Sequence, residues 1–170
     1  TITMNGLSKS HAMTGWRVGF IAGNEKLIDA MGTIQGQSLS NLTTFVQDAA
    51  IQALDFPKSE INKMRDSLQS RRNLAVSLFS REKRIALSSP PGAFYLFPDF
   101  SAWYGKRTPK GALISDSLAL SDYLLRDALV AVVPGSAFGE DRCLRLSFAT
   151  DPASLEKGIG RILEALGKLT

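Results

Sequence analysis

The stretch LSKSHAMTGWRVGFIAGNEKLIDAMGTIQGQ, residues 7–37, contains a polar loop, a short apolar run and an amphipathic segment in succession. The apolar run, residues 16–23, is bounded by glycine and carries β-branched and aromatic side chains, which is typical of a buried strand. Residues 24–37 start with Asn24, a preferred N-cap residue, and repeat apolar side chains at three- and four-residue spacing. The stretch therefore predicts a strand followed by a helix, as in α/β proteins.

Helical and strand patterns continue to alternate on the C-terminal side of this stretch. Helices are predicted over 45–55, 57–80, 115–128 and from Pro152 onward, and strands over 93–100, 129–135 and 143–149. The apolar stripe expected on the longest helix consists of Ile61, Met64, Leu68, Ala75 and Leu78. We expect an α/β arrangement at the start of the chain and a small α+β unit from about residue 57 onward.

Composition narrows the class of protein. The 170 residues are 44% hydrophobic and 21% charged, which fits one globular domain or a large piece of one. No apolar run approaches the roughly 18 residues that a membrane-spanning helix needs, so we expect a cytoplasmic protein that contacts no membrane. Cys143 and His11 are the only residues of their types, which predicts neither an internal disulfide nor a metal site. The net charge of +4 comes from scattered basic residues, so we expect no nucleic-acid partner.

The polar loop places Lys9 and Arg17 eight residues apart among serines and glycines. A lysine amine becomes a useful nucleophile when burial or a neighbouring positive charge lowers its pKa. The planar donor fork of Arg17, together with the Ser8 hydroxyl and backbone amides, suits a phosphate. A reactive amine beside a phosphate site matches pyridoxal 5′-phosphate, which carries an aldehyde and a phosphate. Taken alone, a lysine and an arginine at this spacing also occur by chance.

The same loop, SKSHAMTGWRVG over residues 8–19, closely resembles the S-K-x-x-x-x-x-G-x-R-x-G signature around the active-site lysine of class I/II aminotransferases. These are fold-type I enzymes that depend on pyridoxal phosphate. By this resemblance Lys9 is the catalytic lysine that binds the cofactor aldehyde covalently, and Ser8 and Arg17 bind the phosphate. Gly6 departs from the pattern, because many members carry a further serine there, and one hydroxyl ligand of the phosphate is therefore expected to be missing.

The other residues of the loop receive structural interpretations. We expect His11 to be a structural residue rather than an acid or a base. Packing and turn roles are expected for Thr14, Gly15, Trp16 and Gly19.

The resemblance covers essentially the whole chain. PPGAFYLFPDF, residues 90–100, is similar to the P-x-G-x-F-Y strand of the family's small domain, and the segments VVPGSAFG and CLRLSFA, within residues 132–149, resemble its closing segment. Arg145 then matches the arginine that binds the substrate α-carboxylate, with Gly135 and Phe138 shaping the loop beside it. An arginine inside an apolar strand needs an anionic partner on physical grounds as well, and an internal Asp or Glu would also meet that need.

The family's architecture has consequences for the domains. It implies that residues 1–56 are the C-terminal part of the large cofactor-binding α/β domain, and that residues 57–170 form a connecting long helix and the small α+β domain. The chain starts at TITMNG without an initiating methionine, and the family's ring-contacting residues would lie upstream. We therefore expect a C-terminal portion of a longer enzyme, which is a homodimer by the same resemblance.

The resemblance implies a pyridoxal-phosphate-dependent aminotransferase, which moves an amino group between an L-amino acid and a 2-oxo acid. Its form of the lysine motif favours aspartate as substrate. Two alternatives keep Lys9, Arg17 and Arg145 and stay open: a C–S lyase or synthase on the same scaffold, and a non-catalytic effector-binding domain of a transcription regulator. A plain interaction module would not explain the three basic residues together.

Overall fold

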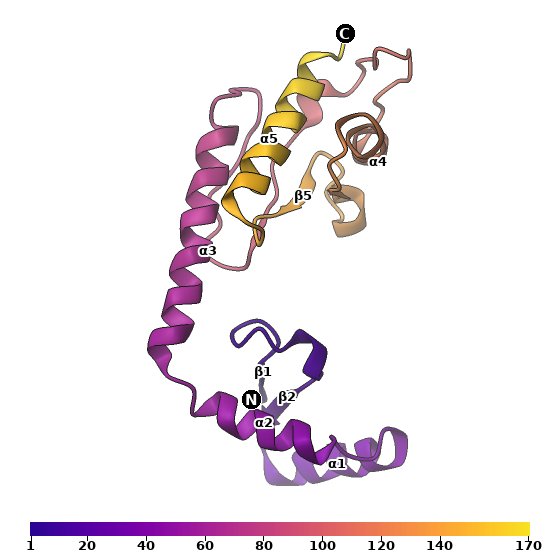
Figure 1. The fold of residues 1–170 in the computed structure, drawn as a ribbon. Coiled ribbons are helices and arrows are strands. Elements are labelled where there is room, and N and C mark those ends of the chain that lie inside the picture. Colours follow the sequence, from indigo (N-terminus) through magenta and orange to yellow (C-terminus); the bar gives the residue numbers. More distant parts are fainter. The chain divides into compact units, whose positions relative to one another are not determined.

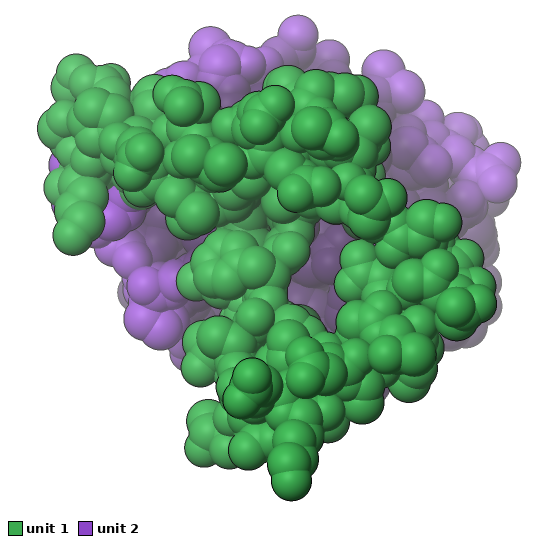
Figure 2. Space-filling model, turned by 90° about the horizontal axis from the view of Figure 1, so that it is seen from below, with its two compact units in different colours: residues 1–64 green, residues 65–170 purple.

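The computed structural model describes residues 1–170, which divide into two compact units. Unit 1 comprises Thr1–Met64 and unit 2 comprises Arg65–Thr170 (Figure 2). Both units contain helices and strands, so the chain is of the α/β class that the sequence predicts. No helix is both long enough and apolar enough to span a bilayer.

Unit 1 starts with a two-stranded antiparallel hairpin (Figure 1). β1 (Thr3–Gly6) pairs with β2 (Gly19–Ala22), and the register runs from Thr3 opposite Ala22 to Gly6 opposite Gly19. β2 lies inside the strand predicted over residues 16–23. β1 was not predicted, because its sequence TMNG ends in Asn-Gly, a pair typical of turns rather than strands.

Two predicted helices complete most of unit 1. α1 (Glu25–Ser38) confirms the helix predicted over 24–37, although Asn24 occupies the N-cap position without a side-chain capping bond. α2 (Thr44–Leu54) confirms the next one, and its Val46 packs with Leu7 and Val18 in a small buried cluster. α1 buries none of its residues within the unit, so its apolar side chains contribute nothing to this cluster.

α3 (Lys58–Phe79) is a 22-residue helix that begins directly after Pro57, as predicted. A proline suits this position because the first turn of a helix leaves its N–H groups without partners. Only Ala75 of the predicted stripe is fully buried, and Phe79, which the stripe left out, is 1% exposed. Ala75 and Phe79 both belong to the core of unit 2.

The sheet of unit 2 has three short antiparallel strands in the order β3–β5–β4. β3 (Tyr95–Leu96) and β4 (Val133–Pro134) flank β5 (Leu144–Ser147), with Tyr95 opposite Ser147 and Val133 opposite Arg145. The predicted strands over 93–100 and 129–135 are thus present but much shorter. Their ends are set by backbone features that hydropathy does not reveal: left-handed φ values of 58° at Ala93 and 56° at Leu129, and Pro98, which lacks an N–H for pairing.

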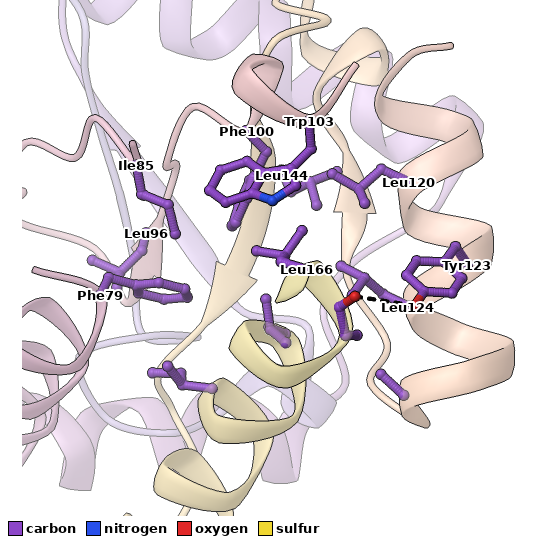
Figure 3. Packing of buried hydrophobic residues seen from close by; sticks show 14 of the residues in the cluster. Phe79, Ile85, Leu96, Phe100, Trp103, Leu120, Tyr123, Leu124, Leu144 and Leu166 are labelled. Atoms are coloured by element: carbon purple, nitrogen blue, oxygen red, sulfur yellow. Dashed lines mark hydrogen bonds between the residues drawn. The ribbon is translucent and has the colours of Figure 1, made fainter. Parts of the chain in front are cut away.

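Helices cover this sheet and supply most of its core. α4 (Ser117–Tyr123) continues as a π-helix over Leu124–Ala128, and α5 (Pro152–Gly167) is capped by Asp151, whose carboxylate accepts a hydrogen bond from Ser154 N at 2.9 Å. Figure 3 shows the packing of Phe79, Leu96, Leu144 and Leu166, which come from two helices and two strands far apart in the sequence. The Tyr123 hydroxyl donates to the carbonyl oxygen of Ala165 at 3.1 Å, which joins α4 to α5.

Candidate functional site

The loop that carries Ser8, Lys9 and Arg17 is closed at its base by two glycines. A Cβ atom added to Gly19 would lie 3.2 Å from the Asn5 carbonyl oxygen, and one added to Gly6 would lie 3.4 Å from the Val18 carbonyl oxygen. The two strands therefore approach closely where the loop begins and ends. Leu7 and Val18, the first and last residues of the loop, are buried with Val46 of α2 and anchor it. The three predicted site residues lie between these anchors.

Hydrogen bonds inside the loop fix its conformation. The Leu7 carbonyl oxygen accepts from His11 N at 3.1 Å. The Thr14 hydroxyl donates to the Ser8 carbonyl oxygen at 3.0 Å, and Arg17 Nη1 donates to the Thr14 carbonyl oxygen at 3.0 Å. Thr14, expected only to pack or turn, thus links the segment of Ser8 to the side chain of Arg17. Apart from the presence of a hydroxyl in the loop, nothing in the sequence indicated this link.

Arg17 has a left-handed backbone conformation, with a φ of 56°. For a residue with a side chain this region costs free energy, and such residues are found where the surroundings enforce them, often at functional sites. The guanidinium has five N–H donors, and its hydrogen bond to Thr14 takes one of them. Lys9 and Arg17 are both exposed, and Ser8 is half-buried. The loop therefore presents an amine, a guanidinium and a hydroxyl.

His11 contacts a neighbouring serine and lines a cavity of unit 1. Its Nδ1 is 2.8 Å from the Ser10 hydroxyl, and the half-buried ring lines an apolar cavity of about 410 Å³ with Met13 and Trp16. These contacts describe a packed side chain, and its expected structural role stays a prediction.

Arg145 is the central charged residue of unit 2's sheet. It lies on β5 between β3 and β4, and its guanidinium carbon lies over two aromatic rings, 4.5 Å from the centroid of Tyr95 and 4.5 Å from that of Phe138. Arg145 takes part in none of the ion pairs of unit 2. The internal Asp or Glu partner that the sequence left open is therefore absent from this unit.

A second arginine, Arg142, forms ion pairs with two carboxylates near the start of β5. Arg142 bonds Glu140 through Nε and Nη2, both at 2.9 Å, and lies 3.6 Å from Asp99. The hydrogen bonds from the Arg142 side chain lower the pKa of Glu140 to about 2. Negative charge near the start of β5 is thus held by Arg142, and Arg145 remains available for an external anion.

The loop that brings Phe138 to Arg145 depends on Gly135. Gly135 N donates to the Cys143 carbonyl oxygen at 2.8 Å, and any Cβ at this position would collide with the carbonyl oxygens of Glu140 and Cys143. The buried Ser117 hydroxyl bonds Asp141 Oδ1 at 2.6 Å and accepts from Ser136 N at 3.2 Å, which ties the loop to the start of α4. The expected role of Gly135 and Phe138 in shaping this loop agrees with these contacts.

The four predicted site residues are distributed over the two units: one loop of unit 1 brings Ser8, Lys9 and Arg17 together, and Arg145 belongs to unit 2. The sequence did not identify Tyr95, Phe138 or Thr14 as residues in contact with the predicted arginines. No group of three or more His, Cys, Asp or Glu side chains is arranged to hold a metal ion.

Comparisons with known proteins give consistent results over nearly the whole chain. Residues 1–162 match the family described as aminotransferase class I and II. The chain is 44% identical over 171 residues to a probable aspartate/prephenate aminotransferase of Aquifex aeolicus, covering 99% of this chain and 42% of that protein. It is also 44% identical over 162 residues to the aspartate/prephenate aminotransferase of Cereibacter sphaeroides, covering 95% of this chain and 40% of that protein.

A solved structure extends the similarity to the fold. The crystal structure of aspartate aminotransferase from Rhizobium meliloti superposes with a TM-score of 0.95 at 40% identity, covering all of this chain and 42% of that one. The predicted fold, the C-terminal portion of a fold-type I transferase, is thereby confirmed. The chain spans about two-fifths of the length of the curated relatives it matches.

Proposed function

The chain belongs to the class I and II aminotransferases, and on that premise we propose that the whole protein transfers an amino group between an L-amino acid and a 2-oxo acid with pyridoxal 5′-phosphate. The observation that carries this proposal is the loop of residues 7–18, on which Ser8, Lys9 and Arg17 share one hydrogen-bonded structure. The roles of these three residues and of Arg145 are part of the proposal.

The groups on this loop fit the cofactor chemically. An exposed primary amine can form a covalent bond with an aldehyde, and a guanidinium and a hydroxyl on the same loop are groups that suit a phosphate. The left-handed backbone of Arg17, held by the loop, is a strain typical of a functional residue. The loop thus supplies both attachment points, the covalent one and the ionic one.

Each residue has a defined task. When bound, the cofactor withdraws electrons from the substrate's α-carbon, which makes the Cα–H bond acidic. Lys9 Nζ binds the cofactor between turnovers, and as a free amine it takes the proton from the substrate's α-carbon. Arg17 and the Ser8 hydroxyl bind the phosphate and keep the cofactor in place. Arg145 binds the substrate's α-carboxylate and orients the Cα–H bond.

We propose aspartate as the amino donor. The motif around Lys9 favoured it, and two relatives at 44% identity are named aspartate/prephenate aminotransferases. Their names also suggest prephenate as an acceptor to be tested. No contact in the structure favours the C–S lyase or the regulator alternative, and product analysis distinguishes both from transamination.

The proposal also covers the assembly. Residues 1–56 would belong to the large domain, and residues 57–170 to the connecting helix and small domain, of a cytoplasmic homodimer. Support for a covered surface comes from unit 1, where Met4, Ile34, Leu39 and Phe45 are each more than 60% exposed. Contact with further protein would remove these apolar side chains from water.

An absorption spectrum of the purified whole protein tests the cofactor proposal. A band near the visible edge that disappears on borohydride reduction, with a pyridoxyl group mapped to Lys9, is the expected result. Incubation with aspartate and 2-oxoglutarate should then yield glutamate and oxaloacetate. A protein that takes up no cofactor, or that releases products other than an amino acid and an oxo acid, would contradict the proposal.

A further inference from the structure

We infer that Tyr95 and Phe138 act as positioning residues, which hold the Arg145 guanidinium so that its in-plane donors face the substrate carboxylate. The inference rests on the proposed function of Arg145. It adds a role for two aromatic side chains for which the sequence indicated none toward the substrate. Tyr95 and Phe138 together are called the ring pair.

The two residues of the ring pair are far apart in the sequence, and both contact the Arg145 guanidinium. Tyr95 comes from β3, and Phe138 comes from the 3₁₀ turn after β4, yet both rings lie 4.5 Å from the same guanidinium carbon. An arginine over an aromatic ring is attracted through its face, while its N–H donors lie in the guanidinium plane. Ring contact therefore restricts the orientation of the plane and leaves the donors for a carboxylate.

The Phe138 ring is not held in place by burial in the core of unit 2. Its side chain is 49% exposed, so it contributes little to the core of unit 2. Its only other ring contact is an edge-on approach to Phe97, with centroids 6.0 Å apart and planes at 88°. An edge-to-face partner of this kind fixes the plane of the Phe138 ring. The exposed Phe138 ring thus contacts both Phe97 and the Arg145 guanidinium.

The surrounding contacts make the arrangement rigid. Gly135 permits the close return of the loop onto the Cys143 carbonyl, and the Ser117 hydroxyl bonds Ser136 N and Asp141. Arg142 pairs with Glu140 and Asp99, so these two carboxylates already have a cationic partner. A preoriented guanidinium loses less side-chain entropy when a carboxylate binds, so the ring pair should raise affinity for the carboxylate in the ground state and in the transition state alike.

The experiment compares ring-deleting with ring-keeping substitutions in the whole holoenzyme. Phe138→Leu and Tyr95→Leu should each raise KM for aspartate about two- to fivefold and leave kcat within twofold, because an exposed cation–π contact is worth about that factor and acts equally on both states. Phe138→Tyr and Tyr95→Phe keep a ring and should restore KM to within about twofold. Leu113→Ala, which removes an apolar side chain of similar exposure (48%), serves as the control for lost surface packing.

A second measurement does not depend on turnover. The dissociation constant of succinate, a dicarboxylate without an amino group, is measured by calorimetry for the same variants. It should increase by the same factor as KM. In an Arg145→Ala background, Phe138→Leu should have no further effect, because the ring would then have no guanidinium to position.

The outcomes separate this inference from the proposed function. Unchanged KM and succinate affinity in both leucine variants would overturn it, and so would equal losses with and without Arg145. Failure of the proposed function would show itself in the wild-type protein as an absence of transamination, and the succinate titration would then still test the ring pair.

Discussion

Arg17 Nη1 donates a hydrogen bond to the carbonyl oxygen of Thr14 at 3.0 Å. The Thr14 hydroxyl in turn donates to the Ser8 carbonyl oxygen at 3.0 Å. One threonine therefore connects the two residues that we propose as phosphate ligands, although they are nine positions apart in the sequence. These two hydrogen bonds lie within the loop itself, so they reduce the conformational entropy that the proposed cofactor binding would have to overcome.

Replacing Thr14 tests this connection. Thr14→Val keeps the shape of the side chain and removes the hydroxyl, so the affinity of the whole protein for pyridoxal 5′-phosphate should fall about fivefold, the usual net value of one hydrogen bond. Thr14→Ser keeps the hydroxyl and should stay within twofold. Fluorescence titration of the apoprotein measures both. Equal affinities of the valine variant and the wild type would mean that Thr14 only packs.

Two substitutions of Arg17 separate its effect on protein stability from its effect on cofactor binding. Its φ of 56° strains any residue with a Cβ atom, so Arg17→Gly should be about 1 kcal/mol more stable than Arg17→Ala. Both variants lack the guanidinium and should bind the cofactor equally weakly. Urea unfolding gives the first difference and cofactor titration gives the second. Equal stability of the two variants would show that the loop relaxes when the arginine is removed.

Local signals were sufficient for most helices. α1, α2, α3 and α5 were predicted within a few residues, because caps, prolines and apolar spacing all act within one or two turns. The strands were predicted too long, since their ends depend on pairing with β5 and on positive φ values at Ala93 and Leu129. The π-helical turn at Leu124–Ala128 carries no sequence signal that distinguishes it from an α-helix.

In the candidate site, too, the residues placed by local sequence could be predicted and those placed by tertiary contacts could not. The lysine motif is continuous in sequence, so Ser8, Lys9 and Arg17 could be identified from it. The ring pair could not, because Tyr95 is 50 residues from Arg145 and reaches it only through the β3–β5 register. The placement of Phe138 follows from the return of the loop at Gly135, which is a consequence of tertiary packing.

Gly135 is predicted to be indispensable for that return. A Cβ there would meet two backbone carbonyls rather than flexible side chains, so Gly135→Ala should lower the free energy of unfolding by about 3 kcal/mol or more. Gly92→Ala, where nothing lies within 4 Å of an added Cβ, is the matched control and should change it by less than about 0.5 kcal/mol. Denaturant unfolding of both variants measures the free energy of unfolding. Equal stability of the two would mean that the loop has another conformation.

Asp116 should contribute a pH-dependent part of the stability of α4. Its carboxylate accepts from Ala119 N at 2.8 Å, and this bond, followed by that from the Ser115 hydroxyl, lowers its pKa below the usual 3.8. A lowered pKa in the folded state means that the stabilisation is complete above about pH 4 and is lost as the pH falls through the folded-state pKa. Asp116→Ala should therefore cost about 1 kcal/mol at pH 7.

The matched variant is Asp116→Asn, which can still cap the helix and does not titrate. Its stability should be close to that of the wild type at pH 7, and the pH dependence contributed by this position should disappear. Urea midpoints at pH 7, 5 and 3 measure the difference. A wild type and an asparagine variant with parallel pH profiles would contradict the assignment of the cap.

Lys9 provides the most direct prediction about chemistry. Lys9→Ala removes the amine that we propose to bind the cofactor and to move the substrate's α-proton, and loss of a proton-transfer group alone costs about 10²- to 10⁴-fold in rate. We expect kcat to fall at least about 10³-fold and borohydride to leave no labelled peptide, while the phosphate contacts of Ser8 and Arg17 still allow weak, reversible cofactor binding. Lys26→Ala, on the exposed surface of α1, is the control and should retain both the label and the activity. A Lys9→Ala protein that still transaminates would assign the covalent attachment to another amine, and with it the proposed role of the whole loop would fail.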